Sequence, residues 1–335
     1  MTDIGFSDLQ ADVAVVIGQR ELVWQSQAMP KILESNQLLC KTLYSVVSPG
    51  TEVAAYLGME PLRDIPKFPR VVGYCNVAEI IEIGSSIEDV NIGDKIINFS
   101  SHRSYFTACK DDIVCNLGYE LEPEKFASAY LFHLGLDAVI RGGVVLGSNV
   151  AVIGLGALGL TSCKMSKLAG ANVVAVSNYD SSMEYGHIFG AKNVLKREEA
   201  QSLENSADVV IITTSTWQDW ELGLKIAKQN GNISILGFPG RGQELPNFNP
   251  LSSKYLYTKQ LKLINVGLPP EKNDSRGYTR FNQRDNMQFI VNAIRGEQIC
   301  AKNLISGVYP FKELSQCYDA LIERSTSPIT FMLKW

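Results

Sequence analysis

The chain has 335 residues, of which 45% are hydrophobic and 20% charged, so it is long enough for about two globular domains and is neither disordered nor a coiled coil. Its formal net charge of -4 comes without any block of like charges, which argues against a nucleic-acid partner. The longest apolar stretch, residues 149–160, contains glycines and is shorter than the ~20 residues that span a bilayer, and residues 1–30 lack a leader pattern. We therefore expect no membrane contact and a cytoplasmic location.

The first 120 residues predict short strands between turns. The β-rich segments are residues 12–17, 38–47, 71–84 and 95–99. Turns such as Ser48-Pro49-Gly50 and Asn91-Ile92-Gly93-Asp94 separate them. Regular short strands with Gly and Pro turns indicate a β-barrel or a β-sandwich, and we expect a barrel.

From about residue 124 the pattern changes to an alternation of helices and strands. In chain order we expect a helix at 126–140, a strand at 149–153, a helix ending at 168, strands at 172–176 and 209–213, a helix at 217–229 and a strand at 232–236. Strands that alternate with helices form parallel βαβ units. The fold class predicted for the whole chain is therefore α/β, with a doubly wound parallel sheet beside the barrel.

The C-terminal part predicts a return to the first domain. After a loop at 269–277 the pattern indicates helices at 280–295 and 311–324, followed by the β-rich segment 329–335. We expect this segment to join the barrel. The predicted domains are thus a discontinuous one, 1–133 with 269–335, and an inserted one, 134–268.

A glycine-rich turn carries the clearest functional motif. Gly154-Leu155-Gly156-Ala157-Leu158-Gly159 directly follows the strand that ends at Ile153 and opens the next helix. In this context Gly154 permits a tight turn, Gly156 lets the backbone approach a pyrophosphate, and Gly159 lets helix and strand pack closely. The helix N-terminus, including Ala157 and Leu158, offers N–H groups to the phosphates. The motif predicts a dinucleotide site, with an ordinary turn as the alternative.

The end of the next strand bears on the choice of dinucleotide. A carboxylate directly after Val176 would accept the ribose hydroxyls of NADH and repel the 2′-phosphate of NADPH. The sequence has the neutral Ser177 and Asn178 there, which favours NADPH over NADH. Tyr179 either stacks on adenine or covers the sheet edge. The remaining residues assigned to the cofactor are Thr213 and Gly237.

The order of elements resembles the medium-chain dehydrogenase/reductase superfamily over nearly the whole chain. Besides the glycine turn, the resemblance rests on the turn at 91–96, on the C-terminal run from Tyr309-Pro310-Phe311 to Trp335, and on Ser48-Pro49-Gly50-Thr51-Glu52. The last motif looks like the Ser-x-Gly-Thr-Glu branch that includes bacteriochlorophyllide-type dehydrogenases. The resemblance implies a GroES-like catalytic domain, a Rossmann domain, an active site in the cleft between them, and a homodimer.

The positions that hold catalytic zinc in that superfamily correspond here to Pro49, Tyr74 and His133. Proline has no ligand atom and a neutral tyrosine is a poor zinc ligand. The run of four cysteines that forms the structural zinc site of the family is also missing, because Cys109 is the one cysteine between Asn98 and Val114. The seven cysteines are scattered, as expected of reduced thiols, and the three histidines lie far apart. We therefore expect no zinc.

Without a metal, a side chain must polarise or protonate the substrate oxygen. Since the resemblance places Tyr74 and His133 at former ligand positions, we expect a phenol beside an imidazole, acting as general acid and proton relay. The alternative is that Tyr74 merely fills the vacated pocket and that His133 is a core histidine bonded to a backbone carbonyl. Thr51 is a third catalytic candidate, and Glu52 is expected to order its loop. Substrate contacts are assigned to Ser48, Tyr56 and Arg280, with ordinary packing as the alternative for Tyr56.

Two further polar segments contain histidine and arginine residues. His102 and Arg103 lie in a Ser-Ser-His-Arg-Ser turn that we expect on the surface. Arg276, Arg280 and Arg284 recur every four residues, so they either share a helix face that holds an anion or form a solvated face.

Together these features predict a zinc-independent, NADPH-preferring oxidoreductase that transfers a hydride between the nicotinamide and an alcohol or ketone carbon of a small molecule. The first alternative is a quinone or enoyl reductase that acts on a C=C bond. The second is a catalytically quiet nucleotide-binding scaffold.

Overall fold

The chain is described by a computed structural model over residues 9–279, 281–324 and 327–335. These residues form two compact units: unit 1 consists of the described parts of Met1–Tyr130 and Met287–Trp335, and unit 2 of Leu131–Asn286. The boundaries predicted from the sequence fall after residues 133 and 268, whereas those in the structure fall after Tyr130 and Asn286, so the second boundary differs more than the first. The segment before α7 (Gln283–Arg295) and the first residues of that helix belong to unit 2, where Asn286 Nδ2 of α7 donates a hydrogen bond to Asp137 Oδ1 at 3.1 Å.

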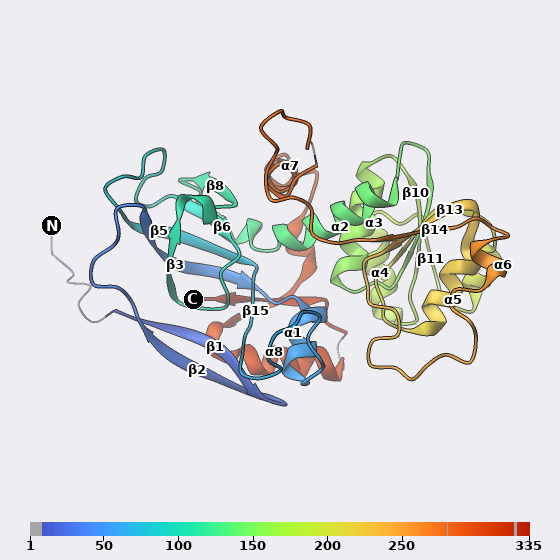
Figure 1. Cartoon of the computed structure of the whole chain (residues 1–335), viewed down its shortest axis with the longest axis horizontal. Coiled ribbons are helices and arrows are strands. Elements are labelled where there is room, and N and C mark those ends of the chain that lie inside the picture. Colours follow the sequence, from blue (N-terminus) through green and yellow to red (C-terminus); the bar gives the residue numbers. More distant parts are fainter. Residues whose placement is uncertain (1–8, 280, 325–326) are drawn as a thin grey trace. The chain divides into compact units, whose positions relative to one another are not determined.

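Unit 1 is rich in β-structure (Figure 1). Its elements are β1 (Gln10–Gly18), β2 (Glu21–Ala28), β3 (Gln37–Val46), α1 (Pro49–Tyr56), β4 (Arg70–Val71), β5 (Asn76–Ile83), β6 (Lys95–Asn98), β7 (Tyr105–Cys109), β8 (Cys115–Gly118), β15 (Ile305–Pro310), α8 (Leu314–Glu323) and β16 (Thr330–Lys334). One sheet has the order β15-β16-β3-β5-β6-β8 with β7 paired to β3, and a second has the order β2-β1-β4. The C-terminal strand β16 runs antiparallel to β3, so the chain end returns to the first domain as the sequence predicts.

The core of unit 1 joins the two ends of the chain. Tyr318 of α8, Leu333 of β16 and Tyr56 of α1 are buried in one apolar cluster. Helix α1 begins at Pro49, a position in the first turn where the missing N–H of proline costs no helical hydrogen bond. The backbone N–H of Glu52 donates to the Ser48 carbonyl at 3.0 Å and completes this turn. These contacts hold the loop after β3 against α8.

Several elements of unit 1 escape the sequence pattern. β2, β7, β8 and α1 are not predicted, and Pro49 was expected only to end a strand. The segment 71–84 is not one strand, because β4 and β5 belong to different sheets. The break falls at Gly73, whose φ of +93° lies in the region that favours glycine.

Unit 2 is a doubly wound parallel sheet, in agreement with the predicted fold class. Its elements are β9 (Asn149–Ile153), α3 (Ala157–Leu168), β10 (Asn172–Val176), α4 (Asp180–Ile188), β11 (Asn193–Leu195), β12 (Ala207–Ile212), α5 (Trp217–Ile226), β13 (Ala227–Ile235), α6 (Ser253–Leu256) and β14 (Lys262–Asn265). The strand order is β11-β10-β9-β12-β13-β14. The order reverses between β9 and β12, and in such sheets ligands bind outside the carboxyl ends of the strands at this point.

The sheet of unit 2 is covered on both faces. Figure 1 shows α3 and α4 on one side and α5 with α6 on the other. Side chains on the α5 side, including Trp220, Leu224 and Tyr255, pack with the strands in one buried cluster. Because both faces are covered, the strands read as continuous apolar runs such as 209–212.

The remaining helices cross between units or are short. α2 (Ala129–Gly142) and α7 (Gln283–Arg295) connect unit 1 with unit 2 along the chain. Short 3-10 helices occupy Lys110–Asp112, Pro123–Phe126, Glu199–Leu203, Ala301–Leu304 and Phe311–Glu313. The predicted helix 311–324 is therefore a 3-10 turn followed by α8.

The helix predicted at 217–229 ends earlier than expected. Ala227 has an extended ψ of 131° and begins β13, where it pairs with Ala207 of β12. Backbone pairing along the sheet outweighs the helical pattern of this polar segment.

Two further features concern the chain as a whole. Within the described residues, no helix combines the length and the apolar character needed to cross a membrane. These residues include all seven cysteines, and none of them forms a disulfide.

Candidate functional site

The glycine turn of unit 2 leaves an open, backbone-lined surface at the end of β9. Gly154 has φ +94°, a Cβ at Gly159 would lie 1.8 Å from the Gly154 carbonyl oxygen, and the space around Gly156 is open within 4 Å. No side chain caps the N-terminus of α3, since the N-cap residue is Gly156 itself. The first backbone N–H groups of α3, from Ala157 and Leu158 onward, thus point at an open position where an anion can bind.

The neighbouring strand ends complete this surface. Thr213 Oγ1, just after β12, donates to the Ile153 carbonyl at 3.0 Å and so fixes the two strand ends side by side. A Cβ at Gly237, after β13, would lie 2.2 Å from the Thr214 carbonyl oxygen, so a side chain there is excluded. The buried hydroxyl of Thr214 makes no hydrogen bond within the protein. The turn, the glycine cradle and this hydroxyl fit a dinucleotide.

The end of β10 places Ser177 and Asn178 beside two cationic residues. Ser177 Oγ accepts the N–H of Tyr179 at 3.2 Å, and Asn178 Oδ1 accepts the N–H of Arg197 at 3.0 Å. Arg197 Nε in turn donates to the buried Asp219 at 2.8 Å, and the exposed Lys196 pairs with Asp180 at 2.9 Å. The sequence pattern does not single out Arg197, which follows β11 and reaches Asn178 only through the pairing of β10 with β11.

Unit 1 gathers a cluster of hydroxyl groups around Tyr74. The phenol of Tyr74 donates to Ser48 Oγ and lies 3.4 Å from Thr51 Oγ1. Burial is the main cause that raises the pKa of Tyr74, so it stays a neutral phenol. The structure thus brings together three of the residues predicted from the sequence, Tyr74, Ser48 and Thr51. Tyr74 lies between β4 and β5, whereas Ser48 and Thr51 lie at the start of α1.

Two aromatic rings accompany this cluster and were missed. The Tyr130 ring packs edge-on against the Tyr74 ring with centroids 5.5 Å apart, and the ring centroids of Phe99 and Tyr130 are 4.7 Å apart. Tyr130 falls in an apolar helical pattern, so the sequence offered no reason to separate it from the core.

A buried polar network lies next to the hydroxyl cluster. The Glu52 side chain, 1% exposed, accepts hydrogen bonds from the Ser48 N–H at 2.6 Å and the Tyr318 hydroxyl at 2.7 Å, and it lies 2.8 Å from His102 Nε2. The expectation that Glu52 orders its loop is confirmed by the bond to Ser48. The expectation of a surface position for His102 is wrong, because its ring is fully buried.

His133 lies in unit 2, on α2, and is fully buried. Its Nδ1 is 3.5 Å from Asp137 Oδ2. Burial lowers the pKa of His133 to about 4 and raises that of Asp137 to about 7, so burial disfavours the charged form of both groups. Tyr74 belongs to unit 1, and the expected pairing of Tyr74 with His133 stays a prediction.

The resemblance places Pro49, Tyr74 and His133 at the positions of catalytic zinc, and the chemistry of these residues does not fit a metal. Pro49 offers no ligand atom, the Tyr74 phenol is engaged with Ser48, and His133 faces Asp137 on its own helix. In the described ranges, no group of three or more His, Cys, Asp or Glu side chains is arranged to hold a metal ion.

The other substrate candidates lie elsewhere. Tyr56 is 3% exposed and packs on Tyr318 at 5.1 Å between ring centroids, which favours the packing alternative. Arg280 lies outside the described residues. The helix-face idea for the arginines is wrong for Arg276, which precedes α7 and pairs with Asp274 at 3.0 Å, whereas Arg284 pairs with Glu271 at 3.1 Å.

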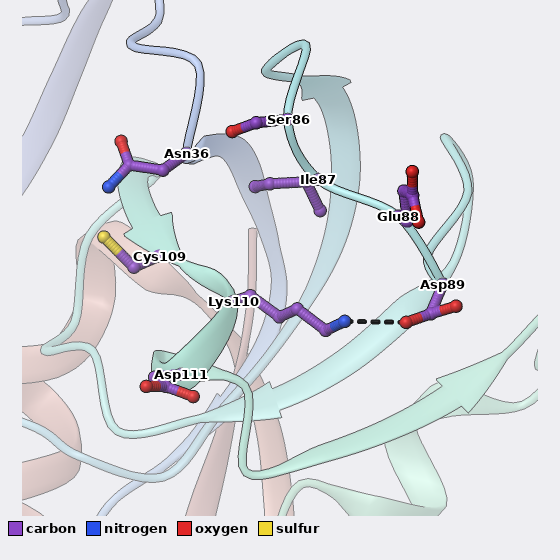
Figure 2. Close-up of a pocket in the computed structure, with 8 residues that line it drawn as sticks. All are labelled: Asn36, Ser86, Ile87, Glu88, Asp89, Cys109, Lys110 and Asp111. Carbon is purple, nitrogen blue, oxygen red and sulfur yellow. Dashed lines mark hydrogen bonds and ion pairs between the residues drawn. The ribbon is translucent and has the colours of Figure 1, made fainter.

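A shallow hollow of unit 1 is shown in Figure 2. It is lined by Asn36, Ser86, Ile87, Glu88, Asp89, Cys109, Lys110 and Asp111. Its cation, Lys110, is neutralised by Asp89 at 2.8 Å. It contains neither the hydroxyl cluster nor the glycine turn, so it is not the candidate site.

Comparison with known proteins gives three kinds of match. The sequence model of the family described as zinc-binding dehydrogenase matches residues 157–281. The L-threonine 3-dehydrogenase of Caldanaerobacter subterraneus is 26% identical over 57% of this chain and 65% of its own length. Sorbitol dehydrogenase 1 of Saccharomyces cerevisiae is 22% identical over 81% of this chain and 83% of its own.

Solved structures share the fold over the full length. 2R,3R-butanediol dehydrogenase from Bacillus subtilis aligns with a TM-score of 0.80 at 17% identity, covering 97% of this chain and 99% of that one. A putative zinc-binding dehydrogenase from Sinorhizobium meliloti, solved with NADP bound, aligns with a TM-score of 0.78 at 15% identity, covering 98% of this chain and 100% of that one. These matches confirm the predicted fold, a GroES-like domain with a Rossmann domain.

Proposed function

We propose that this chain is a member of the medium-chain dehydrogenase/reductase superfamily and a zinc-independent oxidoreductase that uses NADPH to interconvert a small alcohol and its carbonyl compound. The cluster of Tyr74, Ser48 and Thr51 hydroxyls in place of a metal-binding set carries this proposal. The relatives named for threonine and sorbitol oxidation support the alcohol-type substrate.

Unit 2 supplies the cofactor site in this proposal. Gly154, Gly156 and Gly159 form the cradle for the pyrophosphate, and the N–H groups at the start of α3 bind it. The bound nicotinamide supplies or accepts the hydride. Thr214, with its unused hydroxyl, is a further contact for the cofactor.

The preference for NADPH is supported by the neutral residues at the end of β10. Ser177 and Asn178 place no carboxylate at the ribose position, whereas a carboxylate there would repel a 2′-phosphate. The backbone N–H of Arg197 holds Asn178, while the Arg197 guanidinium pairs with Asp219 and Lys196 with Asp180.

Unit 1 supplies the polar groups for the substrate oxygen. A neutral phenol and two hydroxyls can donate hydrogen bonds to an oxygen on which negative charge develops during hydride transfer. The raised pKa of Tyr74 makes it a hydrogen-bond donor first and a proton donor second. Tyr130 and Phe99 form an apolar wall against this cluster, which lowers the local dielectric.

The direct test measures NADPH and NADH binding by fluorescence, followed by turnover against matched panels of ketones, enones and polyols. We expect NADPH to bind about 10-fold or more tightly than NADH, a difference of about 1.4 kcal/mol. We expect ketone reduction with NADPH. Turnover of enones alone would favour the C=C reductase, and binding without any turnover would favour the quiet scaffold.

Two further expectations accompany this function. We propose a cytoplasmic homodimer, as the resemblance implies. Light scattering on the purified protein measures its mass in solution, and a monomer at micromolar concentration would contradict the dimer.

A further inference from the structure

The buried carboxylate of Glu52 collects donors from three distant parts of unit 1. Ser48 N–H bonds Oε1 at 2.6 Å, while the Tyr318 hydroxyl at 2.7 Å and His102 Nε2 at 2.8 Å both meet Oε2. The two oxygens of this side chain have room to accept all three hydrogen bonds, and buried polar groups need such partners. Tyr318 and His102 are themselves fully buried, so these positions are fixed by packing.

The direction of the hydrogen bonds through His102 follows from the residue at the end of the network. Trp335 Nε1 can only donate, and it donates to Ser45 Oγ at 2.9 Å. The single proton of Ser45 is then free to go to His102 Nδ1, 2.8 Å away. His102 Nε2 consequently carries the proton that Glu52 accepts. Every member of the network is satisfied in one consistent arrangement.

The same network touches the hydroxyl cluster from two sides. On one side, Glu52 holds the N–H of Ser48, whose Oγ accepts the Tyr74 phenol. On the other side, the His102 ring packs against Gly73, where an added Cβ would lie 2.6 Å from ring atoms. The backbone N–H of His102 also donates to the Val72 carbonyl at 2.9 Å. Tyr74 directly follows Gly73, so both the phenol and its acceptor depend on this network.

We propose that Glu52, held by His102 and Tyr318, is a positioning residue that sets the geometry of the Ser48 and Tyr74 hydroxyls for the reaction. It acts through Ser48 and Gly73. The inference rests on the proposed function for its catalytic consequence, whereas its geometric content is independent of turnover. A small displacement of a reacting group costs up to about 100-fold in rate, so positioning of this kind has a measurable effect.

The first experiment compares Glu52→Gln with the wild type and with Glu88→Gln, the same change at an exposed glutamate of unit 1. A glutamine offers one acceptor oxygen and one NH2 group, so either Ser48 N–H or the His102 and Tyr318 donors lose their acceptor. We expect kcat to fall between about 10- and 100-fold in Glu52→Gln, with NADPH affinity within twofold of the wild type. Glu88→Gln should equal the wild type. Unchanged kcat in Glu52→Gln would overturn the proposal.

The milder variant Tyr318→Phe guards against a folding defect. It keeps the ring and the carboxylate and removes one donor, so we expect a kcat loss of about threefold with an unchanged circular dichroism spectrum. If Tyr318→Phe lowers kcat more than Glu52→Gln, the carboxylate is not the centre of the network and the proposal fails.

A double-mutant cycle separates positioning of Tyr74 from general support of the fold. If Glu52 acts by placing the phenol, Glu52→Gln lowers kcat far less in a Tyr74→Phe background than in the wild type. Full additivity of the two losses would overturn the proposal.

A spectroscopic readout makes failure of the inference distinguishable from failure of the proposed function. In protein labelled with 3-fluorotyrosine, the Tyr74 resonance is identified by its loss in Tyr74→Phe. We expect Glu52→Gln to move this resonance and Glu88→Gln to leave it in place. An unmoved resonance overturns the inference even in an active enzyme, whereas an inactive wild type overturns the proposed function while the resonance still decides the inference.

Discussion

The glycine turn of unit 2 and the hydroxyl cluster of unit 1 are built in opposite ways. The turn uses the contiguous residues 154–159 and offers backbone N–H groups, with small residues required because Gly159 packs on the Gly154 carbonyl. The cluster uses side chains, Tyr74 with Ser48 and Thr51, supported by a buried network that extends to Tyr318. A site made of backbone tolerates few added atoms, whereas a site made of side chains depends on each distant partner.

The strongest effect is expected from adding a methyl group where the turn is tightest. In Gly159→Ala the new Cβ would lie 1.8 Å from the Gly154 oxygen, so the turn must open. We expect a loss of about 3 kcal/mol in the free energy of unfolding and at least 100-fold weaker NADPH binding, measured by thermal melting and by fluorescence titration.

The matched control for this change is Gly156→Ala, where the surrounding space is open. This variant should fold with wild-type stability and lose only cofactor affinity. Equal melting losses in the two variants would show that the turn is not packed as tightly as the structure has it.

The next effect tests the cluster built of side chains. Tyr74→Phe removes the hydroxyl that donates to Ser48 and keeps the ring against Tyr130. We expect kcat to fall about 100-fold, or about 2.7 kcal/mol in activation free energy, with NADPH affinity unchanged in titration. Turnover within twofold of the wild type would remove Tyr74 from the reaction.

The buried pair on α2 provides a pH test of a side-chain contact inside unit 2. The pKa of Asp137 is raised from 3.8 to about 7, so its contribution to the free energy of unfolding falls as the pH rises between these values. The pKa of His133 is lowered from 6.5 to about 4, so its contribution falls as the pH drops between these values. In the wild type the two slopes oppose each other.

Asp137→Asn removes the Asp137 contribution, so only the His133 contribution to the pH dependence of the free energy of unfolding should remain. Relative to the wild type, we expect the variant to gain roughly 3 to 4 kcal/mol in the free energy of unfolding between pH 4 and pH 7.5, measured by urea titration. Parallel pH profiles of the two proteins would mean that Asp137 is ionised in the folded state.

The smallest effect concerns the ribose position. Ser177→Asp places a carboxylate next to Asn178 and should weaken NADPH binding about 10-fold while NADH binding is kept, because the 2′-phosphate is repelled. The ratio of the two dissociation constants measures this. Ser177→Asn is the neutral control, because asparagine has the same shape as aspartate without its charge. An equal loss of NADPH affinity in both variants would argue for a steric cause.

The sequence predicted the glycine turn because the motif and its local geometry arise within six consecutive residues. It predicted part of the hydroxyl cluster only through the resemblance, which named Tyr74, Ser48 and Thr51. It missed Arg197, Tyr130 and the role of His102, since each acquires its neighbours through strand pairing or packing across the chain.

By itself, the sequence determined that β9 is followed by a glycine-lined helix start and that the chain end rejoins the first domain. Local sterics and the alternation of apolar segments suffice for both. Only the tertiary structure decided that a histidine in a polar turn is buried against Glu52 and Gly73. The physical reason is that a buried polar group is stable only with its partners, and these partners lie as far along the chain as Tyr318 and Trp335.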